Sequence, residues 1–440
     1  VKCIEDEIPF ELPEGWSWTR LGSLFSTITG STPSTKDASL YGDEYPFYKP
    51  TDLDAGFDVC VSEDTVSEKG YKNGRILPMY SVLVTCIGAT IGKTGYIKNS
   101  GICNQQINAI LPNTFILPEY TYFCMCSEFE QQQIWTNSSA TTLPILNKSK
   151  FDILFFPVPP KAQQTRTVER IKELLHFVEI IQQEKRTLQE TIKLTKSKIL
   201  DLAIRGKLVP QDPNDEPASV LLERIRSEKE ELIKQGKIKR DKKESVIFKG
   251  DDNSYYEKIG NDVTCIDDEI SFDIPDTWSW TRISTITDIT MGSSPKSQDI
   301  CNDNQYIEFH QGKIYFSKKT LMKSNQYTRK TTKLAPKQSV LLCVRAPVGE
   351  LNITDRDICI GRGLASIKSL GNINEEFIFY WLHPYKTYLV NQSTGSTFSA
   401  ITSDTVRKIL IPLPPLMEQK EILDKIQKVF TLFENLETVN

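Results

Sequence analysis

The sequence has 440 residues, of which 39 % are hydrophobic and 25 % charged, and its net charge is −4. This length exceeds one ordinary core, so two or three folded units of a water-soluble globular protein are expected. The net charge excludes a uniformly basic nucleic-acid-binding protein, although DNA binding depends on where positive charge lies. Between Lys161 and Gly250, 21 Lys and Arg side chains stand against 15 Asp and Glu.

Targeting, membrane and metal-binding patterns are not evident. The sequence has no run of eighteen or more apolar residues, and its start at Val1 has no signal-peptide core. The ten cysteines are scattered without a CxxC motif, which indicates thiols in a reducing cytoplasm. None of the three histidines lies near a second ligand at useful spacing. We therefore expect a cytoplasmic protein with no membrane contact, no metal and no cofactor.

The chain contains an internal duplication. Residues 3–21 read CIEDEIPFELPEGWSWTRL and residues 265–283 read CIDDEISFDIPDTWSWTRI, an offset of 262 without a gap. The same offset relates GSTP at Gly30 to GSSP at Gly292. Farther on the offset becomes 255, where FPVPP at Phe156 matches IPLPP at Ile411. Matches in one order indicate two copies of one folded unit.

Each copy has a mixed secondary-structure pattern. Trp16 and Trp18 alternate with polar residues after a turn, which predicts a strand. Ser81–Ile87 and Ser339–Val344 are short β-rich runs, and residues 119–135 and 375–391 have helical patterns. An α+β fold is expected, with two repeated α/β domains, each built on a twisted and partly antiparallel sheet.

A long helix follows each copy. Apolar residues alternate at steps of three and four from Ile171 to Leu202, which predicts a helix over Gln163–Leu202 that stops near Gly206 and spans roughly 60 Å. A shorter seam follows the second copy, so an antiparallel coiled coil within the chain is expected. The alternative is that both are ordinary core helices of their own domains. The seam residues expected to pair are Ile171, Leu174, Val178, Ile181, Leu188, Ile192, Ile422, Ile426, Val429 and Phe433.

The stretch between the copies begins with a proline-rich segment. Pro210, Pro213 and Pro217 break the chain, and a second helix is expected to begin near Pro217. It leads into a basic run from Lys234 to Lys243, which is either a solvated linker or an arm that contacts phosphate or a partner. The predicted parts are a first copy of the repeated unit (1–160), a central helical region with a basic linker (161–262), a second copy (263–415) and a distal coiled-coil helix (416–440).

A search for catalytic motifs finds none. Gly88–Thr94 reads GATIGKT, one residue short of the nucleotide-binding pattern GxxxxGK[ST], and the matching Ala346–Glu350 lacks the lysine. No methyltransferase motif of the NPPY type and no GxGxxG or GxSxG is present. An enzyme would need some such arrangement, so no catalytic residue is expected.

Taken together, the LPEGWSWTRLGSL-like openings, the FPVPP and IPLPP exits and the run LVPQDPNDEPASVLLERI resemble the specificity subunit of type I restriction-modification systems. This resemblance implies two target recognition domains that each read half of a split double-stranded DNA sequence. It also implies helical regions that hold them apart and bind two methyltransferase subunits, with motor-nuclease subunits recruited to the complex. The subunit itself would be non-catalytic.

The sequence departs from the family pattern in two places. The distal helix has no counterpart of LVPQDPNDEP after it, and the chain begins at Val1, so we expect a processed chain or a fragment. Other interpretations stay open: a DNA-recognition subunit of a type II-like methyltransferase-nuclease, a truncated silent copy, a cryptic nuclease, or a scaffold without a DNA role.

Three groups of residues are candidate DNA contacts. Hydroxyl-rich turns repeat at matched positions and are expected to hold phosphate, unless they are simple turns. After the central strand, the first copy offers amides and the second an arginine, which suit adenine and guanine respectively, unless the amides are buried and satisfy backbone groups. Weaker phosphate candidates are scattered basic residues. The turn residues are Ser31, Thr32, Thr141, Thr142, Ser293, Ser294, Ser396 and Thr397, the base-reading residues are Asn104, Gln105, Gln106 and Arg362, and the basic ones include Lys93, Lys148 and Arg345.

Overall fold

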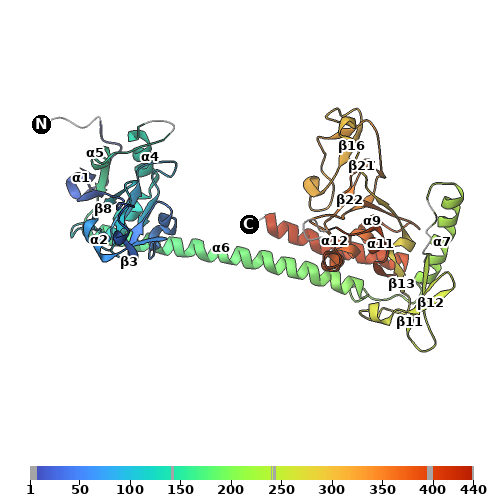
Figure 1. Ribbon diagram of the computed structural model, residues 1–440. Helices are drawn as coiled ribbons and strands as arrows, with labels where there is room; N and C mark the ends of the chain where they lie inside the picture. The colour runs from blue at the N-terminus through green and yellow to red at the C-terminus, as the bar shows by residue number, and fades with distance from the viewer. Residues whose placement is uncertain (1–6, 140–142, 239, 241–243, 394–399, 439–440) are drawn as a thin grey trace. The chain divides into compact units, whose positions relative to one another are not determined.

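The computed structural model describes residues 7–139, 143–238, 240, 244–393 and 400–438. It divides into two compact units, Val1–Gln183 and Glu184–Asn440 (Figure 1). Each unit contains one copy of the duplicated sequence. Residues 17–158 are called repeat 1 and residues 279–413 repeat 2.

Repeat 1 is an α/β domain with three small sheets. Four strands form an antiparallel sheet in the order β2-β8-β5-β6, three form a sheet in the order β4-β3-β7, and β1 pairs with β9. Its strands are β1 (Ser17–Arg20), β2 (Thr27–Thr29), β3 (Tyr41–Tyr48), β4 (Asp64–Val66), β5 (Val82–Thr85), β6 (Thr94–Tyr96), β7 (Ile102–Cys103), β8 (Ile107–Ile110) and β9 (Phe155–Val158). Its helices are α1 (Leu21–Leu24), α2 (Glu68–Asn73), α3 (Pro118–Met125), α4 (Glu128–Asn137) and α5 (Lys148–Asp152).

Repeat 2 has the same plan. Its strands are β13 (Ser279–Arg282), β14 (Thr287–Met291), β15 (Ile300–Cys301), β16 (Ile307–His310), β17 (Tyr327–Thr328), β18 (Leu334–Ala335), β19 (Ser339–Cys343), β20 (Leu351–Thr354), β21 (Ile358–Ile360), β22 (Leu364–Ser369) and β23 (Leu410–Leu413). Its helices are α8 (Ile283–Ile286), α9 (Glu375–Leu382), α10 (Lys386–Asn391) and α11 (Ser403–Arg407). The sheet β14-β22-β19-β20 repeats the order of repeat 1, so the expected fold class is confirmed.

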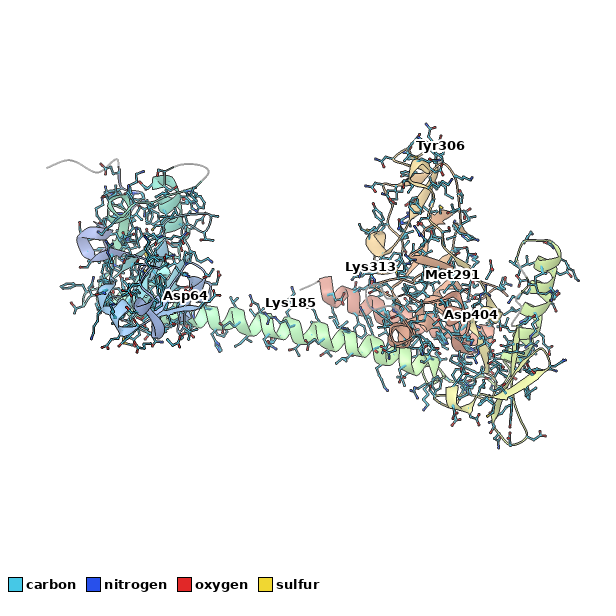
Figure 2. The ribbon with its side chains drawn as sticks, in the orientation of Figure 1. Asp64, Lys185, Met291, Tyr306, Lys313 and Asp404 are labelled. Atoms are coloured by element: carbon cyan, nitrogen blue, oxygen red, sulfur yellow. The ribbon has the colours of Figure 1, made fainter. Side chains whose placement is uncertain are left out.

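The second sheet is larger in repeat 2 than in repeat 1. It has five strands in the order β15-β17-β16-β21-β18, against three in repeat 1. Figure 2 shows Tyr306 at the far end of the extension that these strands build. A small apolar cluster supports the extension from below, with Leu341, Ile358 and Ile360 fully buried. The two repeats therefore share a framework but differ in the surface that this sheet presents.

The duplicated motifs form the first and last strands of each repeat. Thr19 of β1 lies opposite Phe156 of β9, and Thr281 of β13 lies opposite Ile411 of β23. The arginine that ends each WSWTR motif then ties the strand pair to the preceding turn. Arg20 donates to the Ile153 carbonyl (2.6 Å), as Arg282 does to the Lys408 carbonyl (2.8 Å). In each repeat the two motifs therefore pair as the first and last strands of the domain.

Helix α6 (Lys161–Ile204) crosses from the first unit into the second. It covers the predicted helix and ends where predicted, since Gly206 adopts a left-handed φ of +65° that suits a helix C-terminus. Among the described residues, no helix is long and apolar enough to cross a bilayer.

Helix α12 (Leu416–Thr438) packs antiparallel to the end of α6 within the second unit. Near its start, Glu418 accepts from the Gln211 amide (2.5 Å), which follows α6. Near its end, Glu437 pairs with Lys196 of α6 (3.4 Å). The end of α6 and α12 therefore run antiparallel within the second unit, but Ile422 and Ile426 lie in the main core of repeat 2. Part of the alternative interpretation thus holds for α12.

The exposure of the α6 seam differs along the helix. Ile192 is only 4 % exposed, whereas Leu174, Val178 and Ile181 are 48 %, 48 % and 63 % exposed. The first half of the seam is therefore an apolar stripe on the surface of the described chain.

The segment between α6 and repeat 2 contains a helix and a small sheet. Helix α7 (Ala218–Lys234) begins where predicted and packs on repeat 2, with Ile225 fully buried and the Lys229 ammonium donating to the Ser284 carbonyl (2.7 Å). A three-stranded sheet follows, made of β10 (Ser245–Lys249), β11 (Tyr255–Ile259) and β12 (Asp262–Cys265). Glu257 of β11 bonds Arg282, so this sheet is fastened to repeat 2. The basic run from Lys234 to Lys243, interpreted as a linker or an arm, precedes this sheet, and the sheet itself was not predicted.

Candidate DNA interface

In repeat 1, the hydroxyl-rich turn lies against the amide-rich loop. The Ser31 N–H donates to the Cys103 carbonyl (2.8 Å), and the Gly30 N–H donates to the Ile107 carbonyl (2.9 Å). The Thr32 hydroxyl then bonds the Gln105 side chain. Two segments that are some seventy residues apart in sequence are thus in contact.

The same arrangement recurs in repeat 2. The Ser293 N–H donates to the Ile360 carbonyl (3.0 Å), and the Gly292 N–H donates to the Leu364 carbonyl (2.9 Å). The Arg362 N–H donates to the Ser294 hydroxyl (3.3 Å). These matched bonds place Gln105 and Arg362 at equivalent positions of the two loops.

The loops leave the second sheet at the ends of parallel strands. β3 pairs with β7 in parallel, and β16 with β21. The Asn104 N–H donates to the Tyr48 carbonyl (3.1 Å), and the Gly361 N–H donates to the His310 carbonyl (2.7 Å). Each loop therefore has a second segment beside it, and the first residue of that segment is Lys49 in repeat 1 and Gln311 in repeat 2.

Lys49 and Gln311 are not among the residues predicted from the sequence. They follow strands far from the loops in sequence, and only the tertiary pairing of parallel strands brings them into place. A signal was present, since YPFYKP at Tyr45 and IEFHQG at Ile307 stand at the offset of 262 that relates the WSWTR motifs.

The amide side chains in the loop of repeat 1 differ in exposure, because Asn104 is buried and Gln105 is exposed. Asn104 is only 7 % exposed, and its side chain accepts from the Gln106 N–H (3.1 Å) and donates to the Gln106 side chain (3.0 Å). Its structure fits the alternative role, a buried amide that satisfies the loop. Gln105 is exposed, as is Arg362 in repeat 2. The exposed pair is therefore better placed to reach a ligand.

The basic candidates differ in their surroundings. Lys93 pairs with Asp54 (2.6 Å) and Lys148 pairs with Asp152, so their charges are compensated within repeat 1. Arg345 is exposed and follows Val344, whose N–H donates to the Gly363 carbonyl (3.0 Å). Among the described residues, neither Arg345 nor Arg362 has an ion-pair partner for its guanidinium. The bond of Val344 therefore places Arg345 next to the loop of Arg362, whereas Lys93 and Lys148 have their charges paired with carboxylates of repeat 1.

Thr141, Thr142, Ser396 and Thr397 lie outside the described residues. The segments beside them are described and occupy equivalent places. The Leu146 N–H donates to the Cys86 carbonyl (2.8 Å), and the Ile401 N–H donates to the Val344 carbonyl (2.9 Å). The second hydroxyl cluster stays a prediction.

A partly buried ionic cluster lies beside the candidate surface of repeat 2. The Arg356 guanidinium donates two hydrogen bonds of 2.6 Å to the Glu308 carboxylate, which also bonds the His310 ring (2.8 Å). Burial alone would raise the pKa of Glu308, but the bonds from Arg356, Ser324 and His310 outweigh it and lower the pKa to about 2. Burial lowers the pKa of His310, against the attraction of Glu308. The bidentate pair of Glu308 and Arg356 thus stabilises the end of β16, which precedes Gln311.

Within the described residues, no group of three or more His, Cys, Asp and Glu side chains is placed to hold a metal ion.

Comparison with known proteins gives the family. The model of the type I restriction modification DNA specificity domain matches residues 13–190 and 275–440, which is more than half of the chain. The first matched range holds repeat 1 and the first part of α6, and the second holds repeat 2 and α12. The chain belongs to this family. The function of this specificity chain is therefore DNA recognition in a type I restriction-modification system.

Relatives of the specificity chain are similar over different lengths. The EcoAI and EcoEI specificity subunits of Escherichia coli are 22 % and 25 % identical over 99 % and 100 % of this chain, which covers 81 % of each. The putative MjaX specificity subunit of Methanocaldococcus jannaschii is 36 % identical over 37 % of this chain and 39 % of its own length.

Solved structures show the same fold. A chain from a structural study of complex assembly and conformational transition of the type I R-M system matches with a TM-score of 0.70 and 22 % identity, covering 98 % of this chain and 94 % of its own. The HsdS subunit from Thermoanaerobacter tengcongensis matches with a TM-score of 0.59 and 20 % identity, over 98 % and 93 %.

The glycine of the turn in repeat 2 is expected to be essential for the surface of the specificity chain. A Cβ atom at Gly292 would lie 2.1 Å from the Gly361 carbonyl oxygen, so turn and loop could not stay in contact. We expect Gly292→Ala to lower the free energy of unfolding by about 1–3 kcal/mol, measured by urea denaturation.

Gly312 provides the control, because a Cβ there meets nothing within 4 Å. Gly312→Ala should change the free energy of unfolding by no more than about 0.5 kcal/mol. An equal loss in both variants would contradict the importance of the close approach.

Proposed function

We propose that the specificity chain reads a split DNA sequence, with repeat 1 contacting one half-site and repeat 2 the other. The observation that carries this proposal is the common loop framework, in which Gln105 and Arg362 stand at the same position with matched backbone bonds around them. Glutamine suits the N6 and N7 groups of adenine, and arginine suits the O6 and N7 groups of guanine. Readers of two different half-sites need this combination of a shared framework and exchanged side chains.

Phosphate contacts position a protein on the duplex, and base contacts specify the sequence. In this proposal the hydroxyls and backbone N–H groups of the turns at Ser31, Thr32, Ser293 and Ser294 contact phosphate, as does Arg345. Their support is position, since each turn lies directly beside the loop that carries the proposed base-reading residue.

The chain itself is non-catalytic in this proposal and directs methylation or restriction by its partners. Two methyltransferase subunits bind its helical regions, and motor-nuclease subunits join through the complex. The apolar stripe of Leu174, Val178 and Ile181 supports a protein contact on α6, because contiguous exposed apolar side chains mark interaction sites. Helix α6 sets the spacer between the half-sites.

A map of N6-methyladenine tests the proposal. The chain is co-expressed with its neighbouring methyltransferase in a host whose genome is then sequenced for the modification. A split motif that disappears when this chain is omitted is the expected result. Methylation that is independent of the chain would contradict the proposal.

Single substitutions should relax one half-site at a time. We expect Arg362→Ala to weaken discrimination at one base pair of one half-site by about 1–3 kcal/mol, and Gln105→Ala to do so in the other half-site. The methylation motif of each variant gives the measurement. Substitutions that leave both half-sites unchanged would indicate that these loops do not read bases.

A further inference from the structure

Gln311 lies beside the loop that carries Arg362. It follows His310, the last residue of β16, which pairs in parallel with Ile360 of β21. The Gly361 N–H donates to the His310 carbonyl (2.7 Å). A Cβ at Gly361 would lie 3.1 Å from the Gln311 Cγ, and one at Gly363 would lie 2.2 Å from the Gln311 carbonyl oxygen. The two segments thus leave the sheet together and touch along their backbones.

The side chains of Gln311 and Arg362 are exposed and have glycine residues as their chain neighbours. Both residues are exposed, and neither side chain makes a hydrogen bond or ion pair with another described residue. Their neighbours Gly312, Gly361 and Gly363 have no side chains. A Cβ at Gly312 would meet nothing within 4 Å. The polar groups of both side chains are therefore exposed and available to a ligand.

The end of β16, which precedes Gln311, is held in place by burial and by an ion pair. Phe309 and His310 are each 1 % exposed, and Glu308 is held by the bidentate pair with Arg356. A rigid support lets an exposed side chain discriminate between ligands, because its position is set by the fold.

The equivalent position in repeat 1 carries different chemistry. Tyr48 and His310 are the matched strand ends, and they are followed by Lys49 and Gln311. The Lys49 ammonium pairs with Asp64, whereas the Gln311 amide makes no such bond in the described chain. Both positions at this edge, Lys49 with Gln105 and Gln311 with Arg362, thus differ between repeats on one framework.

We propose that Gln311 is a second base-reading residue of repeat 2, and that Gln311 and Arg362 contact neighbouring base pairs of its half-site. The inference rests on the proposed function. Adjacent strands lie about 4.8 Å apart, and stacked base pairs are separated by about 3.4 Å. Side chains that start one strand apart therefore reach adjacent base pairs. Arg362 takes a guanine and Gln311 an adenine, so this half-site contains a G·C pair next to an A·T pair.

The test compares methylation motifs of the full complex. With Gln311→Ala, the preference for A·T next to the Arg362 position should fall by about 5- to 150-fold, with the other half-site and the spacer unchanged. With Gln311→Arg, the preference at that same base pair should change from adenine to guanine, which a merely structural role would not produce. Gln235→Ala, at an exposed glutamine that ends helix α7, is the matched control and should leave the motif unchanged.

The outcomes separate the two proposals. If Arg362→Ala relaxes one half-site and both Gln311 variants keep the original motif, the inference about Gln311 is overturned while the proposed function stands. If Gln311→Ala changes the half-site that Arg362→Ala leaves intact, the inference is also overturned. If no motif depends on the chain at all, the proposed function itself fails.

Discussion

A specificity chain with one heptad inserted after Thr187 should stop directing methylation to its original target and select one with a longer spacer. Seven helical residues add about 10.5 Å, the length of about three base pairs. The insertion preserves the register of the seam, because seven residues are close to two full turns of a helix. Both half-sites should keep their sequences, since neither repeat is altered. A genome-wide map of N6-methyladenine reads spacer and half-sites together.

The matched control changes the same part of α6 without changing its length. Gln189 is exposed, and Gln189→Ala should retain the original spacer and both half-sites. A heptad variant with altered half-site bases would contradict the role of α6 as the element that sets the spacer. A variant that methylates the original target as well as before would contradict it equally, because the helix would then not determine the separation.

The sequence predicted the framework because the framework repeats. The WSWTR motif and the FPVPP or IPLPP motif form a strand pair in each repeat, so each constrains the other and both persist in both copies. Helix α6 could also be predicted from the sequence, since apolar residues at steps of three and four over many turns indicate a helix. The sequence suggested that the turns at Ser31 and Ser293 share a DNA-contacting role with the loops at Gln105 and Arg362. It did not indicate that turn and loop are in contact, which the structure shows in both repeats.

What escaped prediction depends on contacts between distant segments. Lys49 and Gln311 belong to the candidate site through parallel strand pairing, which no local pattern encodes. The sheet formed by β10, β11 and β12 was not predicted, because the basic run before it was interpreted as a linker or an arm. This sheet is stabilised through the bond of Arg282 to Glu257. Burial along α6 was also undetermined, because one seam can be covered at Ile192 and exposed at Ile181.

Arg282→Ala should destabilise the chain more than Gly292→Ala or Arg20→Ala. The Arg282 side chain is 7 % exposed and donates to Glu257 (2.7 Å), Glu269 (2.7 Å) and the Lys408 carbonyl (2.8 Å). Burial opposes its charge, but the two carboxylates raise its pKa above the ordinary value. Removing it leaves the Glu257 carboxylate, which is 11 % exposed, without its guanidinium partner, so we expect a loss of roughly 3–5 kcal/mol in the free energy of unfolding, measured by urea denaturation.

Repeat 1 contains the matched control for this prediction. Arg20 ends the same WSWTR motif, but its side chain is 33 % exposed and pairs with a Glu7 that is 36 % exposed. Water can replace that partner, so Arg20→Ala should cost only about 1 kcal/mol. Replacing Glu257 as well, in Arg282→Met with Glu257→Met, should recover part of the loss because no buried charge remains unpaired. A double variant no more stable than Arg282→Ala would show that the packing of the arginine matters, and not the charge it compensates.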